Sequence, residues 1–549
     1  MDYKLPLQCF AEQVARQPDR VWLNQPDLQG RYYTLTWAQA DDQARRIAAG
    51  LKAQGLQPGD RVSILSKNCA EWFIADLAIM MAGMISVPIY FTAGVTTIQH
   101  VLSHSSSKAI FLGKLDSVEP ADEAIPADVL RIAMPWPTAK SSESWKSWLQ
   151  KYEPIETPAS PRADDTMTIS YTSGSTGLPK GVVLTYKNIA AGAYHSVQTA
   201  QVSAADRALS YLPLAHITER VLVEMLSVCA GCTIYFVESL DTFAKNLAYA
   251  KPTIFISVPR LWTKFQSQIL KKMPQEKLDR LLRIPLLGRL VAWKIRKAMG
   301  LHKCGLFGSG TAPISPSTLE WFSRIGMPIS EGWGMTETSG LACANIPFRK
   351  QDIGTIGVPV PCVEMRLSAD NEIQIRGDTI FEEYYLNPEA TAETFTEGWM
   401  RTGDLGTKLP NGAYKIVGRM KEQFKTGKGK YVAPVPIESL ISANPDVEQV
   451  CVMGSGRKQP IALVVMGGKT ATLSAENRAA LEQRLKEVNS QLEGHQKLDH
   501  IIVASEPWGV ENDFLTPTLK LKRNVLEAHY AAKLEKARLS HPVVWESEI

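Results

Sequence analysis

The segment Tyr171–Gly181 has the residue types of a phosphate-binding loop. Gly174 and Gly177 let the backbone approach a bulky anion without a Cβ in the way, and the backbone amides offer N–H donors. Lys180 adds a positive charge. Four hydroxyl side chains lie in the same stretch: Thr172, Ser173, Ser175 and Thr176. Together these groups can neutralise and orient a phosphate.

The flanking residues predict a hairpin rather than a strand followed by a helix. Met167, Ile169 and Tyr171 form a β-prone run before the loop, and the apolar run Val182–Leu184 follows it. A Walker loop would end in Gly-Lys-Ser/Thr, whereas here Pro179 precedes Lys180. Because no helix begins directly after the loop, a helix N-terminus is not the expected anion site.

The segment Ile329–Thr338 carries groups suited to a base, a phosphate and a metal ion. Trp333 can present a ring face on which adenine stacks, and the hydroxyl of Thr336 can reach a phosphate oxygen. Glu337 provides a hard oxygen ligand for Mg²⁺. The candidate nucleotide-binding residues here are Glu331, Gly332, Trp333, Gly334 and Met335.

Two further segments could contact the rest of a nucleotide. Gly305–Pro313 reads as a strand that ends in a loop able to lie along a flat base, with Gly310, Thr311 and Ala312 as the candidate contacts. It is not a dinucleotide fingerprint, because Pro313 stands where the third glycine should be. Asp404 suits a ribose, since a carboxylate accepts two hydrogen bonds from adjacent hydroxyls.

These segments, in this order, resemble the motifs of the adenylate-forming enzymes: acyl-CoA synthetases, luciferases and nonribosomal adenylation domains. The loop Y-T-S-G-S-T-G-L-P-K-G, the segment T-G-D ending at Asp404 and the intervening motifs match that family within residues 165–525. The segments L-P-L-A-H-I-T-E-R, which contains His216, and T-P-T-L-K-L-K-R, which contains Lys520, are similar to those of long-chain acyl-CoA synthetases.

The resemblance implies an α/β fold with two domains. Residues 1–420 would form a large domain of helix-covered β-sheets with a β-barrel-like subdomain, and residues 421–549 a small, mobile α+β lobe. It also implies a reaction, in which a fatty acid and ATP give an acyl-adenylate and pyrophosphate. Coenzyme A then converts the adenylate to a thioester. The substrates would be ATP, coenzyme A and a long-chain fatty acid, with Mg²⁺ held by Glu337.

The resemblance further assigns roles to residues that composition and spacing alone leave open. His216 would lie near the carboxylate end of the acyl pocket, although a histidine there can equally be a satisfied core residue. Trp262 would gate the acyl tunnel or simply pack. The remaining assignments concern the ribose, the hinge and the two half-reactions: Arg419 at the ribose, Lys421 as the hinge, Lys425 facing thioester formation, and Lys520 with Lys180 as catalytic cations.

The chain departs from the family pattern at three positions. Thr311 stands in place of a glycine, Trp333 in place of the usual tyrosine, and Gly418 where aspartate is common. Either aromatic ring can stack on a base, so the second change leaves the nucleotide role intact. The first leaves the backbone contacts feasible, and the third removes a supporting carboxylate.

Two alternative functions share these motifs. An adenylate-forming ligase could pass the acyl group to an acyl carrier protein or close a β-lactone. A non-catalytic protein could sense nucleotide or fatty acid. The simultaneous presence of Lys180, Glu337, Asp404, Arg419 and Lys520 argues against the sensor.

Composition narrows the setting. The 549 residues carry a formal charge of +4 and lack a basic patch interleaved with aromatics, which gives no support for nucleic-acid binding. Eight scattered cysteines suit a reducing, cytoplasmic compartment, and the lone C-x-x-C at Cys229–Cys232 predicts buried structural thiols. The N-terminus lacks a signal-peptide core. We expect a monomer or homodimer.

Two segments raise the question of a membrane. Trp72–Tyr90 is apolar but contains Asp76 and Pro88, which favours a buried helix followed by a strand over a transmembrane span. Lys271–Met299 alternates basic and apolar residues. It could be a solvated helical face or a peripheral contact with anionic lipid at the inner face of a membrane.

The elements that must position these groups follow from the hydrophobic pattern. Residues 1–165 alternate helical and strand-like segments, including a helix over Thr34–Gln54 and a strand over Arg61–Leu65, which predicts parallel sheets covered by helices. Ser141–Pro161, rich in Pro, Ser and charge, is expected to run over the surface. After the boundary near Lys421, helices and strands alternate in an α+β module.

Overall fold

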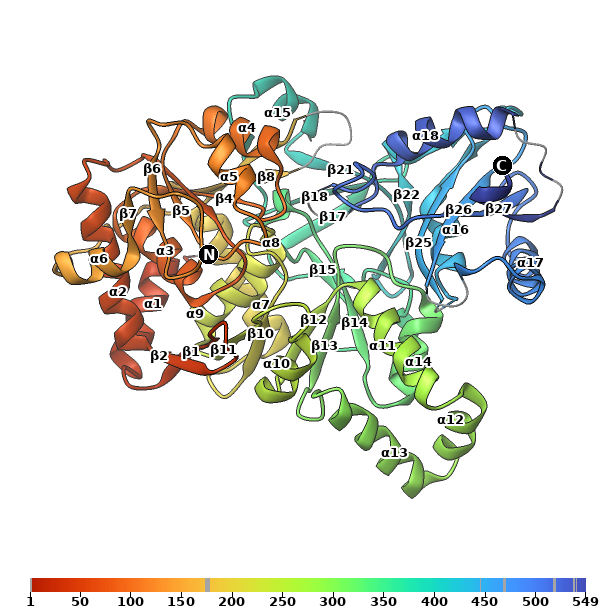
Figure 1. Cartoon of the computed structure of the whole chain (residues 1–549), viewed down its shortest axis with the longest axis horizontal. Coiled ribbons are helices and arrows are strands. Elements are labelled where there is room, and N and C mark those ends of the chain that lie inside the picture. The colour runs from red at the N-terminus through yellow and green to blue at the C-terminus, as the bar shows by residue number, and fades with distance from the viewer. Residues whose placement is uncertain are drawn as a thin grey trace.

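The computed structural model describes residues 2–172, 178–444, 446–467, 471–516, 520–536, 539 and 541–549. The chain forms a large N-terminal part and a smaller C-terminal part, which Figure 1 shows in blue beside the larger body. The expected two-domain α/β architecture is therefore confirmed.

The first large sheet has eight strands and carries the predicted loop. Five of its neighbouring pairs are parallel, whereas β9 pairs antiparallel with β8 and β19 pairs antiparallel with β9. The strands, in spatial order, are β19 (Glu383–Tyr384), β9 (Lys180–Thr185), β8 (Thr166–Thr172), β4 (Ile85–Ile89), β3 (Arg61–Leu65), β5 (Ser107–Leu112), β6 (Leu130–Ala133) and β7 (Glu143–Ser144).

The second large sheet has nine strands. Its central strands are parallel, while the pairs β1–β2, β14–β15 and β15–β16 are antiparallel. The strands, in spatial order, are β16 (Val358–Pro359), β15 (Cys343–Ala344), β14 (Ile329–Trp333), β13 (Leu306–Ser309), β12 (Ile254–Ser257), β10 (Arg207–Ser210), β11 (Thr233–Phe236), β1 (Val21–Pro26) and β2 (Tyr32–Thr36).

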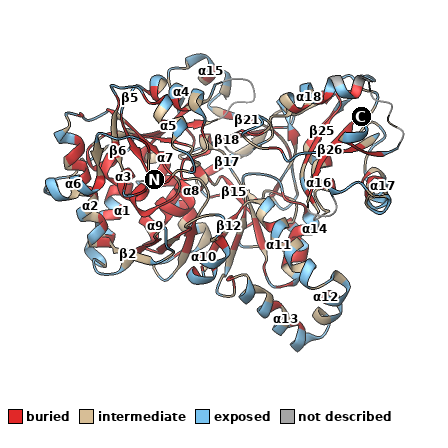
Figure 2. Ribbon diagram, viewed as in Figure 1, coloured by how far each residue is buried: buried red, intermediate tan, exposed pale blue. Residues whose placement is uncertain are grey.

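Helices fill the space between and around these sheets. Helix α3 (Ala70–Met81) is buried along its whole length and contacts β3 and β4 of one sheet and β1 of the other. Figure 2 shows the buried residues gathered in this interior. The other helices up to residue 300 are α1 (Pro6–Arg16), α2 (Trp37–Ala53), α4 (Val95–Ser105), α5 (Glu119–Ala124), α6 (Trp145–Lys151), α7 (Tyr186–Ala200), α8 (Ile217–Glu219), the π-helical turn η1 (Arg220–Met225), α9 (Leu226–Ala230), α10 (Phe243–Ala250), α11 (Pro259–Lys272), α12 (Gln275–Leu282) and α13 (Pro285–Ala298).

A five-stranded antiparallel sheet joins the two parts of the molecule and stands where the barrel-like subdomain was expected. Its strands run in the order β17 (Val363–Leu367), β18 (Glu372–Gly377), β21 (Trp399–Lys408) and β20 (Phe395–Thr396), and β22 (Tyr414–Arg419) also pairs with β21. The helical elements around it are α14 (Pro316–Arg324), η2 (Thr336–Thr338), η3 (Lys350–Asp352) and α15 (Pro388–Thr394).

The C-terminal part is a four-stranded sheet with helices on both faces. Alternate residues of the strand Ile461–Met466 belong to two separate hydrophobic clusters on opposite faces of the sheet. One cluster includes residues of α16 and α17, and the other includes residues of α18. Its elements are η4 (Met420–Glu422), β23 (Phe424–Lys425), β24 (Tyr431–Val432), α16 (Pro434–Ile441), β25 (Val447–Met453), β26 (Ile461–Met466), α17 (Ala475–Ser490), β27 (His500–Val503), α18 (Arg523–Lys536), β28 (Val543–Trp545) and η6 (Glu546–Glu548).

One sequence-based expectation about element boundaries was wrong. The helix expected over Thr34–Gln54 begins only at Trp37, because Thr34–Thr36 pair with β1 and Thr36 caps α2 by accepting a hydrogen bond from Gln39 N. The segment Ser141–Pro161 runs over the surface as expected, with only Trp145 and Trp148 buried. It also contains the short strand β7 and the helix α6, which carries both tryptophans.

The expectation of a buried helix followed by a strand over Trp72–Tyr90 is confirmed, and the expectation of buried thiols at Cys229 and Cys232 is confirmed in part. The apolar segment forms the buried helix α3 followed by β4, and no helix within the described residues is long and apolar enough to cross a membrane. Cys232 is buried, but Cys229 is only partly buried, and its Sγ lies 3.6 Å from Sγ of Cys9.

Candidate active site

The predicted phosphate loop connects two antiparallel strands, as expected. Thr172, the last residue of β8, pairs with Lys180, the first residue of β9. Both therefore stand at the mouth of the hairpin. The predicted loop contacts Ser173, Gly174, Ser175, Thr176 and Gly177 lie outside the described residues.

Lys180 and Glu337 are linked through a tyrosine that the sequence did not suggest. Strand β19 adds to the edge of β9, and its Tyr384 donates a hydrogen bond from its hydroxyl to Glu337 Oε1 at 2.8 Å. The Lys180 Nζ lies 5.1 Å from the centre of the Tyr384 ring. Burial and the Glu337 carboxylate raise the pKa of Tyr384, so the phenol stays protonated and keeps donating. The pairing of β19 with β9 was not visible in the sequence.

The buried Glu337 is suited to a hard cation whose other ligands are oxygen atoms of water and of a substrate phosphate. Tyr384 occupies one carboxylate oxygen, which leaves Oε2 as the candidate ligand. No cluster of three or more His, Cys, Asp or Glu side chains able to hold a metal occurs within the described residues. A single carboxylate fits Mg²⁺, which usually keeps several waters and binds through one or two carboxylates together with substrate phosphates.

Neighbouring parallel strands bring two predicted segments together. Strands β13 and β14 pair so that Ser309 lies opposite Glu331, which places Gly310 and the residues after it beside Gly332. A Cβ at Gly310 would lie 3.2 Å from Gly332 O. The two segments therefore form one surface at the carboxyl ends of the strands, the usual place for ligand sites in parallel sheets.

Backbone conformation explains two residues of this surface. A Cβ at Gly334 would lie 1.6 Å from Gly340 O, so only glycine fits there. Thr311, the residue in place of a family glycine, has a φ of 70°, a region that β-branched residues rarely adopt. Thr311 and Ala312 are both exposed. Thr336 and Met335 follow at the start of η2, partly buried.

Glu331, on β14, is a second acidic side chain of this surface. Burial raises the pKa of Glu331 to about 8, although Gly354 N donates to its Oε2 at 3.1 Å. At neutral pH the Glu331 carboxyl is therefore mostly protonated and can donate a hydrogen bond. This makes Glu331 a candidate contact for a base or a hydroxyl and a poor ligand for a cation.

The predicted adenine and ribose residues contact one another. Trp333 donates from Nε1 to Asp404 Oδ2 at 3.0 Å, and Arg419 donates from Nε to Asp404 Oδ1 at 2.6 Å. Asp404 and Arg419 face each other across β21 and β22. Burial alone would lower the pKa of Arg419, but the Asp404 carboxylate outweighs it and raises the pKa. The indole is thus held in place by its edge.

Lys520 reaches this site from the C-terminal part. It stands at the base of a hairpin in which Thr516 N donates to Lys520 O at 2.8 Å. Removal from water and the nearby Arg419 charge lower the pKa of Lys520, while Glu337 and Asp404 oppose that shift. Lys520 remains exposed to solvent.

His216 lies close enough to Lys520 for the lysine charge to act on it. Burial lowers its pKa to about 3, and the positive charge of Lys520 adds to that effect. The ring is therefore neutral at physiological pH. Thr218 N donates to His216 Nδ1 at 3.2 Å, which leaves the proton on Nε2. The residue can offer a hydrogen bond to a carboxylate but no positive charge.

The last two residues of the same motif, Glu219 and Arg220, are structural. Glu219 is buried, and its Oε1 accepts hydrogen bonds from Asn68 Nδ2 at 3.2 Å and Tyr211 N at 2.9 Å. Arg220 donates to Asp76 Oδ1 at 2.6 Å and to Oδ2 at 2.8 Å, with both side chains fully buried. These residues tie the site to α3 rather than to a ligand.

Trp262 is a core side chain in this structure. It is fully buried on α11, donates from Nε1 to Gly308 O at 3.3 Å, and packs edge-on against Phe255 and Phe322. The side chain belongs to the second hydrophobic cluster of the N-terminal part. A gate at this position would have to open by moving out of that cluster.

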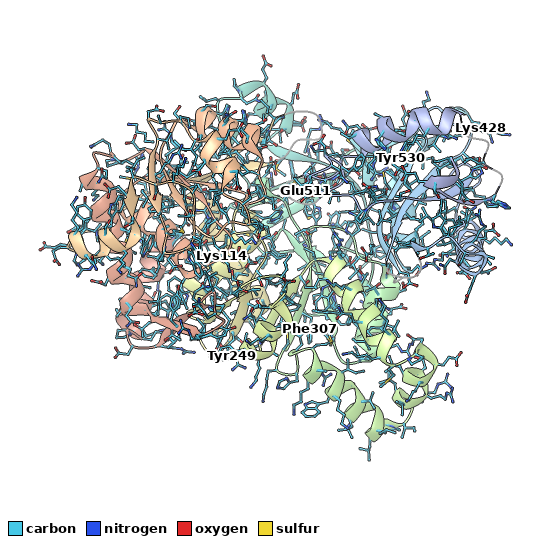
Figure 3. The ribbon with its side chains drawn as sticks, in the orientation of Figure 1. Lys114, Tyr249, Phe307, Lys428, Glu511 and Tyr530 are labelled. Carbon is cyan, nitrogen blue, oxygen red and sulfur yellow. The ribbon has the colours of Figure 1, made fainter. Side chains whose placement is uncertain are left out.

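Lys421 and Lys425 lie at and beyond the junction of the two parts. Lys421 is exposed within η4, between the last strand of the five-stranded sheet and β23. Lys425 Nζ lies 5.7 Å from the centre of the Tyr431 ring. Lys428, in the turn between Lys425 and Tyr431, lies at the outer end of the C-terminal part in Figure 3, far from the N-terminal body. The structure thus brings Lys520, but not this turn, to the site.

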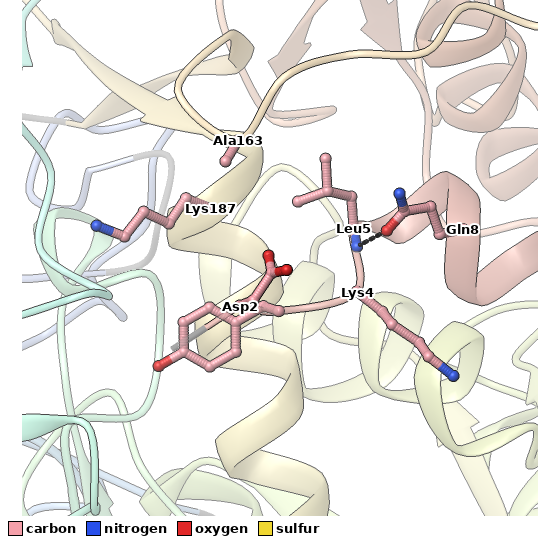
Figure 4. A pocket seen from close by; sticks show the side chains of 7 residues that line it. Asp2, Lys4, Leu5, Gln8, Ala163 and Lys187 are labelled. Carbon is pink, nitrogen blue, oxygen red and sulfur yellow. Dashed lines mark hydrogen bonds between the residues drawn. The ribbon is translucent and has the colours of Figure 1, made fainter.

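A cavity of about 270 Å³ near the N-terminus is separate from these groups. Figure 4 shows its lining, in which Leu5 N donates to Gln8 Oε1 at the start of α1. Lys187, another lining residue, pairs with Asp378 at 3.1 Å. None of the predicted site residues lines this cavity.

Comparisons with known proteins agree with this arrangement. Residues 10–385 match the family model described as AMP-binding enzyme, and residues 422–539 match the model described as AMP-binding enzyme C-terminal domain.

Two curated relatives and one solved structure illustrate the likeness. The long-chain-fatty-acid–CoA ligase FadD15 of Mycobacterium bovis is 33% identical over 574 residues, covering 94% of each chain. Long chain acyl-CoA synthetase 2 of Arabidopsis thaliana is 29% identical, covering 96% of this chain and 91% of its own. The anthranilate CoA ligase AuaEII in complex with anthranoyl-AMP has the same fold, with a TM-score of 0.81 at 21% identity over 98% of both chains.

Proposed function

The chain belongs to the AMP-binding enzyme family, and from this membership we propose that it is a long-chain fatty acid–CoA ligase. The fatty acid and ATP give acyl-adenylate and pyrophosphate, and coenzyme A then gives acyl-CoA and AMP. The observation that carries the proposal is the convergence of Lys520, from one part of the molecule, on Glu337, Asp404 and Arg419 of the other. Relatives named long-chain fatty acid–CoA ligases or acyl-CoA synthetases match over nearly the whole chain.

The first half-reaction needs positioning and charge neutralisation more than a base. A fatty carboxylate is ionised at neutral pH, so it can attack the α-phosphorus directly once two anions are brought together. In our proposal Lys180 and the hairpin amides neutralise the departing pyrophosphate, and Lys520 the α-phosphate. His216, neutral and protonated on Nε2, orients the carboxylate through a hydrogen bond. Mg²⁺ bound by Glu337 would supply further neutralisation of phosphate charge.

The nucleotide would lie along the surface at the ends of β13 and β14. Asp404 and Arg419 would contact the ribose, and the indole edge held by Asp404 would orient the ring of Trp333 beside adenine. The predicted contacts with the rest of the nucleotide are Gly310, Thr311, Ala312, Glu331, Gly332, Gly334, Met335 and Thr336.

The second half-reaction requires the pantetheine arm to approach where Lys520 stands. The thiolate of coenzyme A attacks the acyl carbon, and the bond to AMP breaks. We propose that the small lobe, residues 421–549, turns about Lys421 so that Lys425 and the turn after it face the site. The C-terminal family match begins at residue 422, which supports this boundary. Trp262 would open toward the acyl chain.

The setting of the protein is proposed from the same reasoning. It would act in the cytoplasm as a monomer or homodimer, without nucleic acid, and in peripheral contact with the inner face of a membrane that holds its water-insoluble substrate. The charge of only +4 over 549 residues supports the absence of nucleic acid.

The decisive experiment incubates the purified protein with ATP, Mg²⁺, palmitate and coenzyme A. We expect palmitoyl-CoA, AMP and pyrophosphate in equal amounts. Pyrophosphate release without palmitoyl-CoA would favour transfer to a carrier protein or, with a hydroxy acid, a β-lactone. Neither product, with nucleotide or fatty acid still bound, would leave the non-catalytic sensor.

A further inference from the structure

Helices α12 and α13 form a projection on the N-terminal part. Figure 1 shows both helices extending away from the sheets, at the corner of the molecule below α11 and α14. The turn between them is tight, since a Cβ at Gly288 would lie 2.8 Å from Leu282 O. The two helices contact each other, so the projection is a compact hairpin.

The outer face of α13 is apolar. Leu286, Leu290 and Trp293 are spaced four and three residues apart and therefore share one side of the helix, with 81%, 47% and 39% of their surfaces exposed. Ile284 and Leu287 extend the same exposed area. The opposite side, with Gly288 and Ala292, is buried against the rest of the molecule. Figure 2 shows α13 as largely exposed.

Positive charge surrounds this apolar stripe. Residues 271–303 contain ten Lys or Arg and two Asp or Glu, a formal charge of +8, whereas the whole chain carries only +4. Arg289 and Lys294 flank the stripe on either side, and Lys297 Nζ lies 4.8 Å from the centre of the Trp293 ring. One of the two acids, Asp279, is already paired with Arg324.

We infer that the α12–α13 hairpin docks on an anionic phospholipid bilayer. Leu286, Leu290 and Trp293 enter the headgroup region, while the flanking Arg289, Lys294 and Lys297 meet lipid phosphates. An exposed apolar stripe bordered by cations, with tryptophan at its edge, is the pattern of a helix that lies in a membrane interface. A nucleic acid would match the positive charge but would not bury the leucines. An acidic protein partner is less favoured, because the apolar stripe lies on a convex projection rather than in a groove that a partner could fill.

The position of the hairpin relates docking to substrate supply. α12 follows α11 after two residues, and α11 carries Trp262, the proposed gate. Docking would thus bring the α11 side of the molecule to the bilayer in which a long-chain fatty acid dissolves. This consequence rests on the proposed function, whereas docking itself does not.

The test is sedimentation of the full chain with vesicles of phosphatidylcholine alone and of phosphatidylcholine mixed with phosphatidylglycerol. We expect strong binding to the anionic vesicles, weakened by salt, and little binding to the neutral ones. The triple variant Leu286→Ser, Leu290→Ser, Trp293→Ser should lower the partition coefficient by roughly tenfold or more. Arg289→Glu with Lys294→Glu should do the same without removing apolar area.

Matched controls use exposed residues elsewhere. Leu28→Ser with Leu240→Ser removes exposed leucines outside the hairpin and should leave binding unchanged. Equal binding by the triple variant and the wild type would overturn the inference. So would a wild type that is dimeric in solution and becomes monomeric in the triple variant while still binding vesicles, because the stripe would then be a subunit interface.

Activity separates this inference from the proposed function. With a water-soluble medium-chain acid and no vesicles, the triple variant should form acyl-CoA at the wild-type rate. If the wild type binds vesicles through the hairpin but makes no acyl-CoA, docking stands and the proposed function fails. If it makes acyl-CoA but all variants bind vesicles alike, the proposed function stands and the docking inference fails.

Discussion

At the scale of single residues, the proposed mechanism depends on Lys520. Lys520→Ala should lower fatty-acid-dependent pyrophosphate release at least roughly tenfold, because the α-phosphate loses its neutralising charge. The same variant should convert supplied acyl-adenylate and coenzyme A to acyl-CoA at nearly the wild-type rate. The two half-reactions are measured separately, by pyrophosphate release and by thioester formation.

A matched control lies two residues away. Lys522 is paired with Asp513 on the same hairpin, so Lys522→Ala removes one positive charge close by without touching the site. It should leave both half-reactions near the wild-type rate. Equal losses in the two half-reactions for Lys520→Ala would refute the division of labour.

Glu219 gives a prediction about pH. Burial raises the pKa of Glu219 to about 8 from an ordinary value of 4.5. The folded state therefore binds this proton more tightly, and the resulting stability is fully present below pH 4.5 and is lost as pH rises through about 8. Glu219→Gln keeps an oxygen for Asn68 and Tyr211 but cannot ionise, so it should gain stability relative to the wild type as pH rises, by on the order of 1 kcal/mol per pH unit within that window.

Thermal unfolding between about pH 5 and 9 checks the Glu219 prediction. Glu153→Gln, which neutralises an exposed carboxylate, serves as the control and should show no such trend. A difference between wild type and Glu219→Gln that stays constant across this range would mean that Glu219 is ionised in the folded protein.

At the scale of elements, the π-helical turn η1 is fastened to α3 by a buried ion pair. The Arg220 guanidinium donates hydrogen bonds of 2.6–2.8 Å to Asp76 on α3, Thr168 on β8 and Ser86 on β4. Burial raises the pKa of the neighbouring Glu224 well above its usual range, so this second carboxyl stays neutral. Arg220 thus forms its close ion pair with Asp76.

Arg220→Met should therefore destabilise the N-terminal part by about 3–5 kcal/mol, because it leaves the Asp76 charge buried without a partner. The thermal or denaturant transition of that part is the measurement. The control is Arg162→Met, which breaks an exposed pair with Asp165 and should cost less than about 1 kcal/mol. Similar losses in the two variants would show that the buried pair contributes no more than an exposed one.

At the scale of the whole molecule, the proposed function depends on how the two parts are joined. The structure holds Lys520 at the site while the turn containing Lys428 lies at the far end of the small lobe (Figure 3). This is the arrangement that the proposed adenylation step requires. A single orientation cannot serve thioester formation if Lys425 and its turn must also reach the site.

Lys421→Pro should separate the two steps. Proline fixes φ near one value and restricts the residue before it, so rotation about this position should be hindered. We expect thioester formation to fall at least roughly tenfold while pyrophosphate release changes by less than about twofold. Lys421→Ala, which removes the charge but not the rotation, should retain both steps. A matching loss in Lys421→Ala would place the effect in the side chain instead of the hinge.

Much of the candidate site could be proposed from the sequence because its residues are grouped in short segments. Each segment carries its own chemistry, as with Glu337 beside Trp333 or the glycines of the hairpin, and turn residues mark its position between strands. Several boundaries were also predictable, such as the strand Arg61–Leu65, because local periodicity determines them.

What the sequence alone determined was therefore local: the chemical types present and the strands and helices that build the parallel sheets. Tertiary structure decided which groups meet. Tyr384 reaches Glu337 only because β19 pairs with a strand about 200 residues earlier, and Asp404 is shared by Trp333 and Arg419 only because two different sheets converge. Likewise, Arg220 became structural and Glu331 protonated through burial, a property of packing in three dimensions that no single segment encodes.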